Sequence, residues 1–232
     1  METHTMKVIA HIESEFPEKF GIPRQSSLVP ELRARVVFEP EYRVADAVRG
    51  IEGFSRLWLI WQFSRAVRED WSPTVRPPRL GGNERMGVFA TRSPFRPNPI
   101  GLSCVALEGV AHDALLGPVL LVSGADLLDG TPIYDIKPYL PYADAFPDAR
   151  GGFAQAPPAP LEVVCDAPLP EGMDERTRAA LLGVLSQDPR PGYHKDPTHV
   201  YGLSFGGWEV RFRVEQGTLH LLSALRAPSE RA

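Results

Sequence analysis

The first two thirds of the chain consist largely of short segments rich in β-branched and aromatic residues. Gly, Pro and Asp turns bound these segments, and no long helical pattern separates one from the next. Strands are expected at 6–12, 34–40, 55–63, 85–91, 100–111, 118–128 and 132–140, with a short helix at 42–54. Strands without crossover helices favour an antiparallel sheet. We therefore predict a mostly β protein with a β-barrel, not a doubly wound parallel sheet.

The composition changes after the last of these strands. Residues 146–162 are rich in Pro, Gly and Ala, as is typical of a linker. Glu171 to Asp188 then has apolar residues at helical spacing, and the following proline ends the pattern. Three further strands are expected at 200–205, 208–214 and 218–225. The predicted organisation is a barrel domain at 1–145, a linker at 146–162 and a small α+β domain at 163–232.

Charge and apolar runs narrow the possible partners. The formal net charge of −4 argues weakly against nucleic acid, but residues 76–101 contain five arginines and one acid. No apolar run approaches the roughly 20 residues that span a bilayer. The N-terminal residues lack a signal-peptide pattern. We expect a cytoplasmic protein without membrane contact.

Metal and nucleotide motifs are missing from the sequence. The two cysteines form no CxxC pair, and the six histidines are scattered, so no metal site is expected. Neither GxGxxG after a strand nor GxxxxGK[ST] occurs, which excludes the standard dinucleotide and phosphate cradles.

Residues 92–101, "RSPFRPNPIG", form a segment that we call the lip. Its three prolines fix φ and remove amide donors, so it cannot be a central strand. A stiff segment presents Arg92, Arg96 and Asn98 at low entropic cost, which is what a binding site needs. A structural brace is the alternative.

Two further segments are dense in polar residues. In 126–144, strand alternation places Asp135, Lys137 and Tyr139 on one face, next to a tight turn. These groups could transfer a proton and bind an anion, or they could be a satisfied ion pair beside a half-buried tyrosine. In 186–195, Arg190, Tyr193 and Lys195 suit an RNA loop or a solvated helix end equally well.

Six segments together carry a resemblance to a known family: "EKFGIPRQ", "AVRGIEGFSRLWLI", "TVRPPRLGGN", "GVFATRSPFRPNPIGLS", "DLLDGTPIYDIKPYLP" and "QDPRP". Over nearly the whole chain the sequence resembles the TsaA-like family, closest to its bacterial tRNA (adenine-N6)-methyltransferases. The resemblance implies a β-barrel that uses S-adenosylmethionine without a Rossmann fold. It also implies a homodimer with the methyl-donor site near the subunit interface. The implied substrate is threonine tRNA carrying N6-threonylcarbamoyladenosine at position 37, and the product is its N6-methyl derivative.

The resemblance also assigns roles to individual residues. The implied donor-binding residues are Pro23, Arg24, Gln25, Phe63, Ser64, Arg92, Leu102, Asp126, Leu127, Leu128 and Asp129. Ser64 stands where the family commonly has histidine, and serine cannot titrate near neutrality.

The chemistry of the reaction suggests further roles. Arg96 or Lys137 would recognise the threonyl carboxylate, Asp135 could accept the N6 proton, and Tyr139 completes the candidate catalytic set. Candidate RNA-binding residues are Arg76, Arg79, Arg85, Arg190, Tyr193 and Lys195.

Two other functions remain compatible with the sequence. One is a non-catalytic RNA-binding barrel whose basic lip clamps a tRNA loop. The carboxylates at Asp126 and Asp129 speak against it, because they repel a phosphate chain. The other is a methyltransferase of the same fold with a different acceptor.

Overall fold

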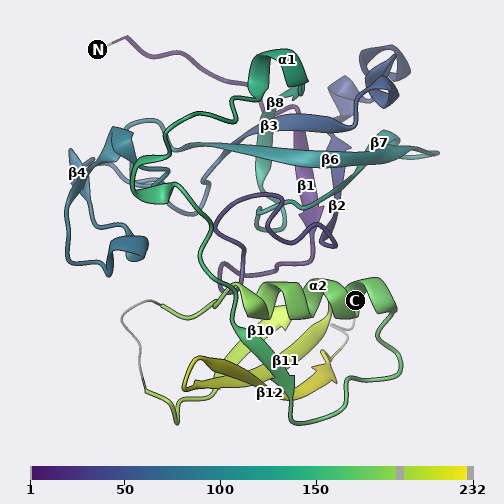
Figure 1. Ribbon diagram of the computed structural model, residues 1–232. Helices are drawn as coiled ribbons and strands as arrows, with labels where there is room; N and C mark the ends of the chain where they lie inside the picture. The colour runs from purple at the N-terminus through teal and green to yellow at the C-terminus, as the bar shows by residue number, and fades with distance from the viewer. Residues whose placement is uncertain (1, 192–195, 229–232) are drawn as a thin grey trace.

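Six antiparallel strands close into a barrel in the order β1-β2-β7-β6-β3-β8, in a computed structural model that describes residues 2–191 and 196–228 (Figure 1). The strands are β1 Ala10–Ser14, β2 Arg33–Phe38, β3 Arg56–Gln62, β6 Ile100–Asp113, β7 Gly117–Ser123 and β8 Pro132–Pro138. β1 pairs with both β2 and β8, which closes the barrel. The predicted mostly β fold with an N-terminal barrel is confirmed.

Alternation along the strands builds the core of the barrel. In β3, Leu57, Leu59 and Trp61 are buried, while the residues between them are partly exposed. The same period places Ser103 and Val105 of β6 on the inner face. The barrel is therefore filled by side chains and is not an open channel.

Three segments differ from the sequence-based expectation. The predicted helix at 42–54 is wrong: short 3-10 turns at Pro40–Tyr42, Ala45–Val48 and Ile51–Gly53 replace it, interrupted where Gly50 adopts a φ of 83°. The strand predicted at 118–128 ends at Ser123, because Gly124 turns the chain with a φ of 72°.

The strand predicted at 85–91 is reduced to the two residues of β5, Met86–Gly87, which pair with β4, Thr74–Val75. A 3-10 turn at Val88–Ala90 follows. The amide of the buried Val88 still donates to Pro73 O at 2.9 Å, in register with the ladder, but Pro73 has no N–H with which to return a bond. Another 3-10 turn lies at Pro78–Leu80.

The C-terminal part consists of helix α2, Glu175–Ser186, packed on a four-stranded sheet in the order β10-β11-β12-β9. The strands are β9 Glu162–Cys165, β10 Tyr201–Phe205, β11 Trp208–Glu215 and β12 Thr218–Arg226. Asp174 caps the helix by accepting the Thr177 amide at 3.1 Å. In Figure 1, α2 lies on the side of the sheet that faces the barrel. The predicted small α+β domain is confirmed.

Strand β9 was not among the predicted strands. It is a four-residue edge strand, parallel to β12, and its first residue, Glu162, is the last residue of the predicted linker. The chain between β8 and β9 contains only a one-turn helix, α1 Pro141–Asp144, and a 3-10 turn at Gly152–Ala154. No helix in residues 2–191 and 196–228 is long and apolar enough to cross a membrane.

The segment between β1 and β2, residues 15–32, takes part in both halves of the molecule. Phe16, Val29 and Leu32 are buried in the hydrophobic cluster of the C-terminal sheet and α2. The strands on either side of the segment belong to the barrel. We call residues 15–32 the shared segment.

A substitution at Gly101 tests how tightly the barrel is packed next to the lip. A Cβ on Gly101 would lie 2.3–2.6 Å from atoms of the Trp61 indole ring, so we expect Gly101→Ala to displace that ring. Overpacking of this kind lowers the free energy of unfolding by about 1–3 kcal/mol. Urea denaturation measures the change. Gly202→Ala in β10 is the control, because nothing lies within 4 Å of its added Cβ. Equal midpoints for the two variants would contradict the predicted clash.

Candidate functional site

A buried chain of hydrogen bonds joins β3, β6 and the segment after β7. Trp61 Nε1 donates to Ser103 Oγ at 2.9 Å, and Ser103 Oγ donates to Asp126 Oδ1 at 2.5 Å. Ser103 is fully buried and Trp61 is 6% exposed. Burial raises the pKa of Asp126 to about 6, although the Ser103 hydroxyl and the Arg92 charge oppose the rise. Burial therefore disfavours the charged form of the Asp126 carboxylate.

Arg92 and Gln25 lie next to this carboxylate. The Arg92 guanidinium donates to Gln25 Oε1, and its positive charge also acts on Asp126. Arg92 comes from the lip and Gln25 from the shared segment, so the contact joins two segments far apart in sequence. The structure thus brings together three of the residues that the resemblance assigned to the methyl donor.

The serines that follow Gln25 fasten the shared segment to the barrel. Ser26 Oγ accepts the Cys104 amide at 3.0 Å, and Ser27 Oγ donates to Cys104 O at 3.0 Å. The Ser27 amide donates to Gly124 O at 2.8 Å, with Ser27 in the left-handed region at a φ of 63°. A non-glycine residue in that region is uncommon and is held by its surroundings.

The lip is anchored at the open end of β3. The Phe63 amide donates to Pro99 O at 2.8 Å, and the Phe63 ring packs edge-on against Trp61 with 4.3 Å between centroids. Arg96 Nη1 donates to Thr91 O, just before the lip, at 3.2 Å. Pro99 thus accepts a bond from the residue that follows β3, and, having no N–H, it returns none.

Several residues of the implied donor set lie elsewhere. The Leu102 side chain points out of the barrel and is 50% exposed. Leu127 is fully buried in the barrel core, and Leu128 is buried as well. Asp129 Oδ1 accepts the Ser14 amide at 2.9 Å. The Ser64 amide donates to Gln62 O, so its backbone is held without its side chain.

Pro23 and Arg24 line a small hollow between the shared segment and the end of α2. Gly21 and Ile22 continue the same wall, and the opposite wall consists of Val184, Gln187, Asp188 and Pro189. The hollow places the residues just before Gln25 against the C-terminal part of the molecule.

The candidate catalytic residues in β8 and directly after it lie on the outer face of the barrel. Lys137 Nζ and Asp135 Oδ2 form an ion pair at 2.9 Å, and Tyr139 packs against Trp58 with 5.9 Å between ring centroids. Of the two interpretations that the sequence left open, the geometry corresponds to the ion pair beside a half-buried tyrosine. The cross-strand partners of Lys137 and Asp135 are Trp58 and Ile60 of β3.

The candidate RNA-binding arginines have different surroundings. Arg76 and Arg85 are exposed beside β4 and β5. Arg79 donates to Ala156 O in the chain that leads to β9. Arg190 is paired with both carboxylate oxygens of Asp188, at 2.8 and 2.9 Å, and this hydrogen bonding raises the pKa of Arg190. Tyr193 and Lys195 lie outside the described residues.

Sequence reasoning did not single out Trp61, Ser103, Ser26 and Ser27. The available signal was the inward position of Ser103 in an otherwise apolar alternation, because a polar side chain there needs a buried partner. Within the described residues, no group of three or more His, Cys, Asp or Glu side chains could hold a metal ion.

Comparison with known proteins identifies the family. Residues 11–145 match the tRNA-methyltransferase O N-terminal domain, and residues 164–226 match the TrmO C-terminal domain. The chain is 45% identical over 224 residues to a tRNA (adenine(37)-N6)-methyltransferase of Escherichia coli, covering 92% of this chain and 94% of that protein. It is 43% identical to the putative S-adenosylmethionine-dependent methyltransferase RcsF of Pseudomonas aeruginosa, covering 94% and 95%.

A solved structure agrees with these matches. The crystal structure of TrmO from Pseudomonas aeruginosa superposes with a TM-score of 0.79 at 35% identity, covering 96% of this chain and 98% of that one. Sequence and fold agree across both halves of the molecule, which favours an enzyme over a non-catalytic RNA-binding barrel. The chain therefore belongs to the TrmO family of tRNA (adenine37-N6)-methyltransferases.

Proposed function

We propose that this enzyme transfers a methyl group from S-adenosylmethionine to N6 of N6-threonylcarbamoyladenosine at position 37 of threonine tRNA, in the cytoplasm. The observation that carries the proposal is the half-buried Asp126 carboxylate with its raised pKa beside Arg92, which itself contacts Gln25, in a chain of this family. The donor, the modified base and the tRNA surface are argued separately below.

The residues around Asp126 suit a cationic methyl donor. Burial removes the water that stabilises the charged form of a carboxylate. A positively charged ligand replaces that stabilisation, so a carboxylate shielded from water favours binding of a cation. S-adenosylmethionine carries a sulfonium and an ammonium group. The Gln25 amide and the half-buried Phe63 ring offer hydrogen-bonding and apolar contacts to the rest of the donor molecule. Asp126, Gln25 and Arg92 would hold the donor.

The lip is the best candidate for reading the modified base. The threonyl group ends in a carboxylate, which an arginine fork recognises in bidentate fashion. Arg96 uses one N–H on Thr91 O, and its remaining donors bond to none of the residues that the structure describes. Lys137 suits the role less well, because Asp135 already neutralises its charge. We assign recognition of the threonyl group to Arg96.

The transfer itself needs positioning more than acid or base. When bound, the donor supplies the methyl group, its sulfonium becoming a thioether as N6 gains methyl and loses its proton. An in-line displacement is favoured mainly by holding donor and acceptor in register. The carbamoyl group makes the N6 proton more acidic, so the transfer needs no strong base. Asp135 would act only as the acceptor of that proton.

The tRNA backbone would bind the basic surface beside the lip. Arg76 and Arg85 are exposed there, while the net charge of the chain is −4. A local basic patch is enough for phosphate contacts, and such contacts make binding salt-dependent. Arg190 contributes less in this arrangement, because Asp188 pairs with it.

The outer face of β3 and β6 is the proposed meeting surface of two chains. Ile100 and Leu102 are 37% and 50% exposed, and Ile60 lies directly across from Leu102. Adjacent exposed apolar side chains on a barrel favour a two-fold interface. Leu102 would then reach the donor site from the subunit boundary.

The proposed interface predicts a dimer, so light scattering of the wild-type enzyme in solution should give the mass of two chains. Ile60→Glu puts a carboxylate in the middle of the proposed interface and should give single chains. A wild-type protein that stays monomeric at assay concentration would contradict the interface.

Methyl transfer tests the proposed function directly. Labelled S-adenosylmethionine is incubated with the enzyme and threonine tRNA prepared with or without the threonylcarbamoyl group. We expect label only on the modified tRNA. Equal labelling of both would indicate a different acceptor. No label, together with no binding of the donor, would contradict the proposal.

Arg96→Ala tests whether the lip reads the threonyl carboxylate. We expect kcat/KM on modified tRNA to fall by about 10²-fold, the effect of losing one charge-assisted contact and its positioning. Binding of the donor alone should stay unchanged. Arg96→Lys is the matched control for charge, and it should recover only part of the activity because lysine lacks the fork. Full activity in the alanine variant would exclude the assignment.

The raised pKa of Asp126 predicts that this carboxylate destabilises the enzyme in the absence of a ligand. Its folded-state pKa of about 6 lies above the ordinary 3.8, so the folded state holds the proton more tightly. The free energy of unfolding therefore falls as pH rises from 3.8 through 6, by about 1–3 kcal/mol. Asp126→Asn should stabilise the protein at pH 7.5 and leave it nearly unchanged at pH 4.

Urea denaturation at the two pH values measures this difference, with Asp129→Asn as the control. Asp126→Asn should also bind S-adenosylmethionine less well than the wild type does. An Asp126→Asn effect that is equal at both pH values would contradict the charge argument.

A further inference from the structure

The shared segment is held by the C-terminal sheet through its aromatic residues. Phe16 packs edge-on against Phe205 with 5.4 Å between ring centroids. Phe20 stacks on Tyr201 at 6.2 Å and on Phe212 at 6.3 Å. The partners belong to β10 and β11, and most of them are fully buried. These contacts make the first half of the segment part of the C-terminal core.

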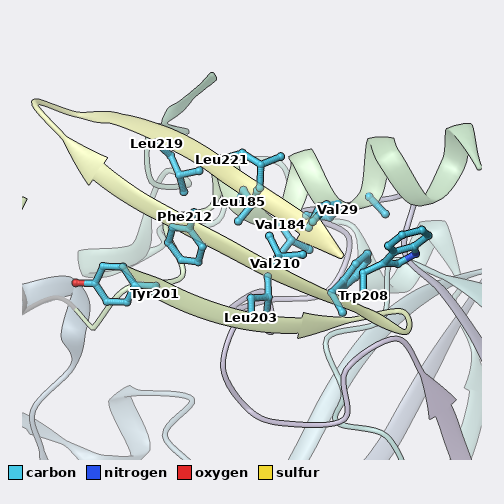
Figure 2. Close-up of a cluster of buried hydrophobic side chains, with 14 of the residues drawn as sticks. Val29, Val184, Leu185, Tyr201, Leu203, Trp208, Val210, Phe212, Leu219 and Leu221 are labelled. Carbon is cyan, nitrogen blue, oxygen red and sulfur yellow. The ribbon is translucent and has the colours of Figure 1, made fainter. Parts of the chain in front are cut away.

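Two glycines show how closely the segment is packed. A Cβ on Gly21 would lie 2.4 Å from Leu203 Cδ1, and Gly21 also has a φ of +90°. A Cβ on Gly183 of α2 would lie 2.7 Å from Val29 Cγ1. Figure 2 shows Val29 among Val184, Leu185 and Val210 of this core. Both halves of the segment therefore touch the C-terminal part with no room for one additional methyl group.

Ion pairs hold the C-terminal end of the segment. Arg33 Nη2 donates to both oxygens of Asp174 at 2.9 and 3.0 Å and to Thr177 Oγ1 at 2.7 Å. Arg176 Nε donates to Glu31 O at 3.0 Å, and the rest of its guanidinium pairs with Glu108 of β6. The first turn of α2 is thereby fixed to the barrel at the point where the shared segment enters β2.

The middle of the segment has no regular structure and lies in the candidate site. Gln25 contacts Arg92, while Ser26 and Ser27 bond to β6 and to the end of β7. Neither a helix nor a strand sets the backbone of these residues. Their conformation depends on contacts to the barrel on one side and on the packed ends of the segment on the other.

We propose that the C-terminal sheet and α2 are a positioning element for methyl-donor binding: by gripping both ends of the shared segment, they hold residues 23–27 in the conformation that binds S-adenosylmethionine. This inference rests on the proposed function of the site. It assigns to α2 and the sheet a role in binding the donor that is separate from any contact with tRNA. The pair Val29 and Gly183 acts through the segment and touches no reacting atom.

Gly183→Ala is the sharpest test. Alanine favours a helix over glycine, so α2 itself should stay folded. The added methyl pushes Val29, two residues from Ser27, and we expect the affinity for S-adenosylmethionine without tRNA to fall by about tenfold. Val29→Ala removes the methyl groups that would clash. The double variant Gly183→Ala, Val29→Ala should therefore bind the donor better than Gly183→Ala alone.

Isothermal titration calorimetry with S-adenosylmethionine measures the affinities, and thermal unfolding of each variant checks that it is folded. Gly202→Ala is the matched control, because it changes glycine to alanine in the same part of the molecule with free space around the Cβ. It should bind the donor as the wild type does. Recovery in the double variant would support positioning when Gly183→Ala is itself fully folded at the titration temperature, since its weaker binding then does not come from unfolded protein.

Two results would overturn the inference. Wild-type affinity in Gly183→Ala would show that the segment binds the donor regardless of how α2 packs. Equal losses in Gly183→Ala and in the double variant would show that the clash with Val29 is not the cause. If the wild-type enzyme itself does not bind S-adenosylmethionine, the proposed donor site fails and this inference fails with it.

Discussion

Residues 15–32 are held from two sides: their apolar side chains pack in the C-terminal core, while Ser26 and Ser27 bond to the barrel. The barrel needs the segment to join β1 to β2, and the C-terminal core needs its Phe16, Val29 and Leu32 side chains. Deleting the C-terminal part would expose large apolar side chains of the segment to water. The two halves are therefore joined by this segment as well as by a linker. The candidate site lies where the segment crosses the end of the barrel.

The site combines a stiff wall with a destabilised charge. The prolines fix the lip before any ligand arrives, and the hydrogen bond from Phe63 to Pro99 attaches it to β3. Burial still disfavours the charged form of Asp126, although the Ser103 hydroxyl and the nearby Arg92 stabilise it. Such groups persist at functional sites, where the cost to the free protein is offset when a ligand binds.

Much of the fold could be predicted because its signals are local. The alternation of Leu57, Leu59 and Trp61 and the proline-braced lip are visible in short windows. The donor contacts could be named only from the resemblance, and their arrangement stays a prediction. The Trp61–Ser103–Asp126 chain depends on the register of β3 against β6, which no short window contains. The same holds for the shared segment, whose partners lie far along the chain.

The ion pair between Arg33 and Asp174 has a consequence for biosynthesis, because its members are separated by 141 residues. A ribosome makes the chain from the N-terminus, so the whole barrel is synthesised before α2 and β10 exist. Contacts of such large sequence separation form late and slowly. During that interval Phe16, Phe20 and Val29 lack their partners. The nascent chain would thus pass through a state with a closed barrel, an incomplete candidate site and an apolar strip available to chaperones.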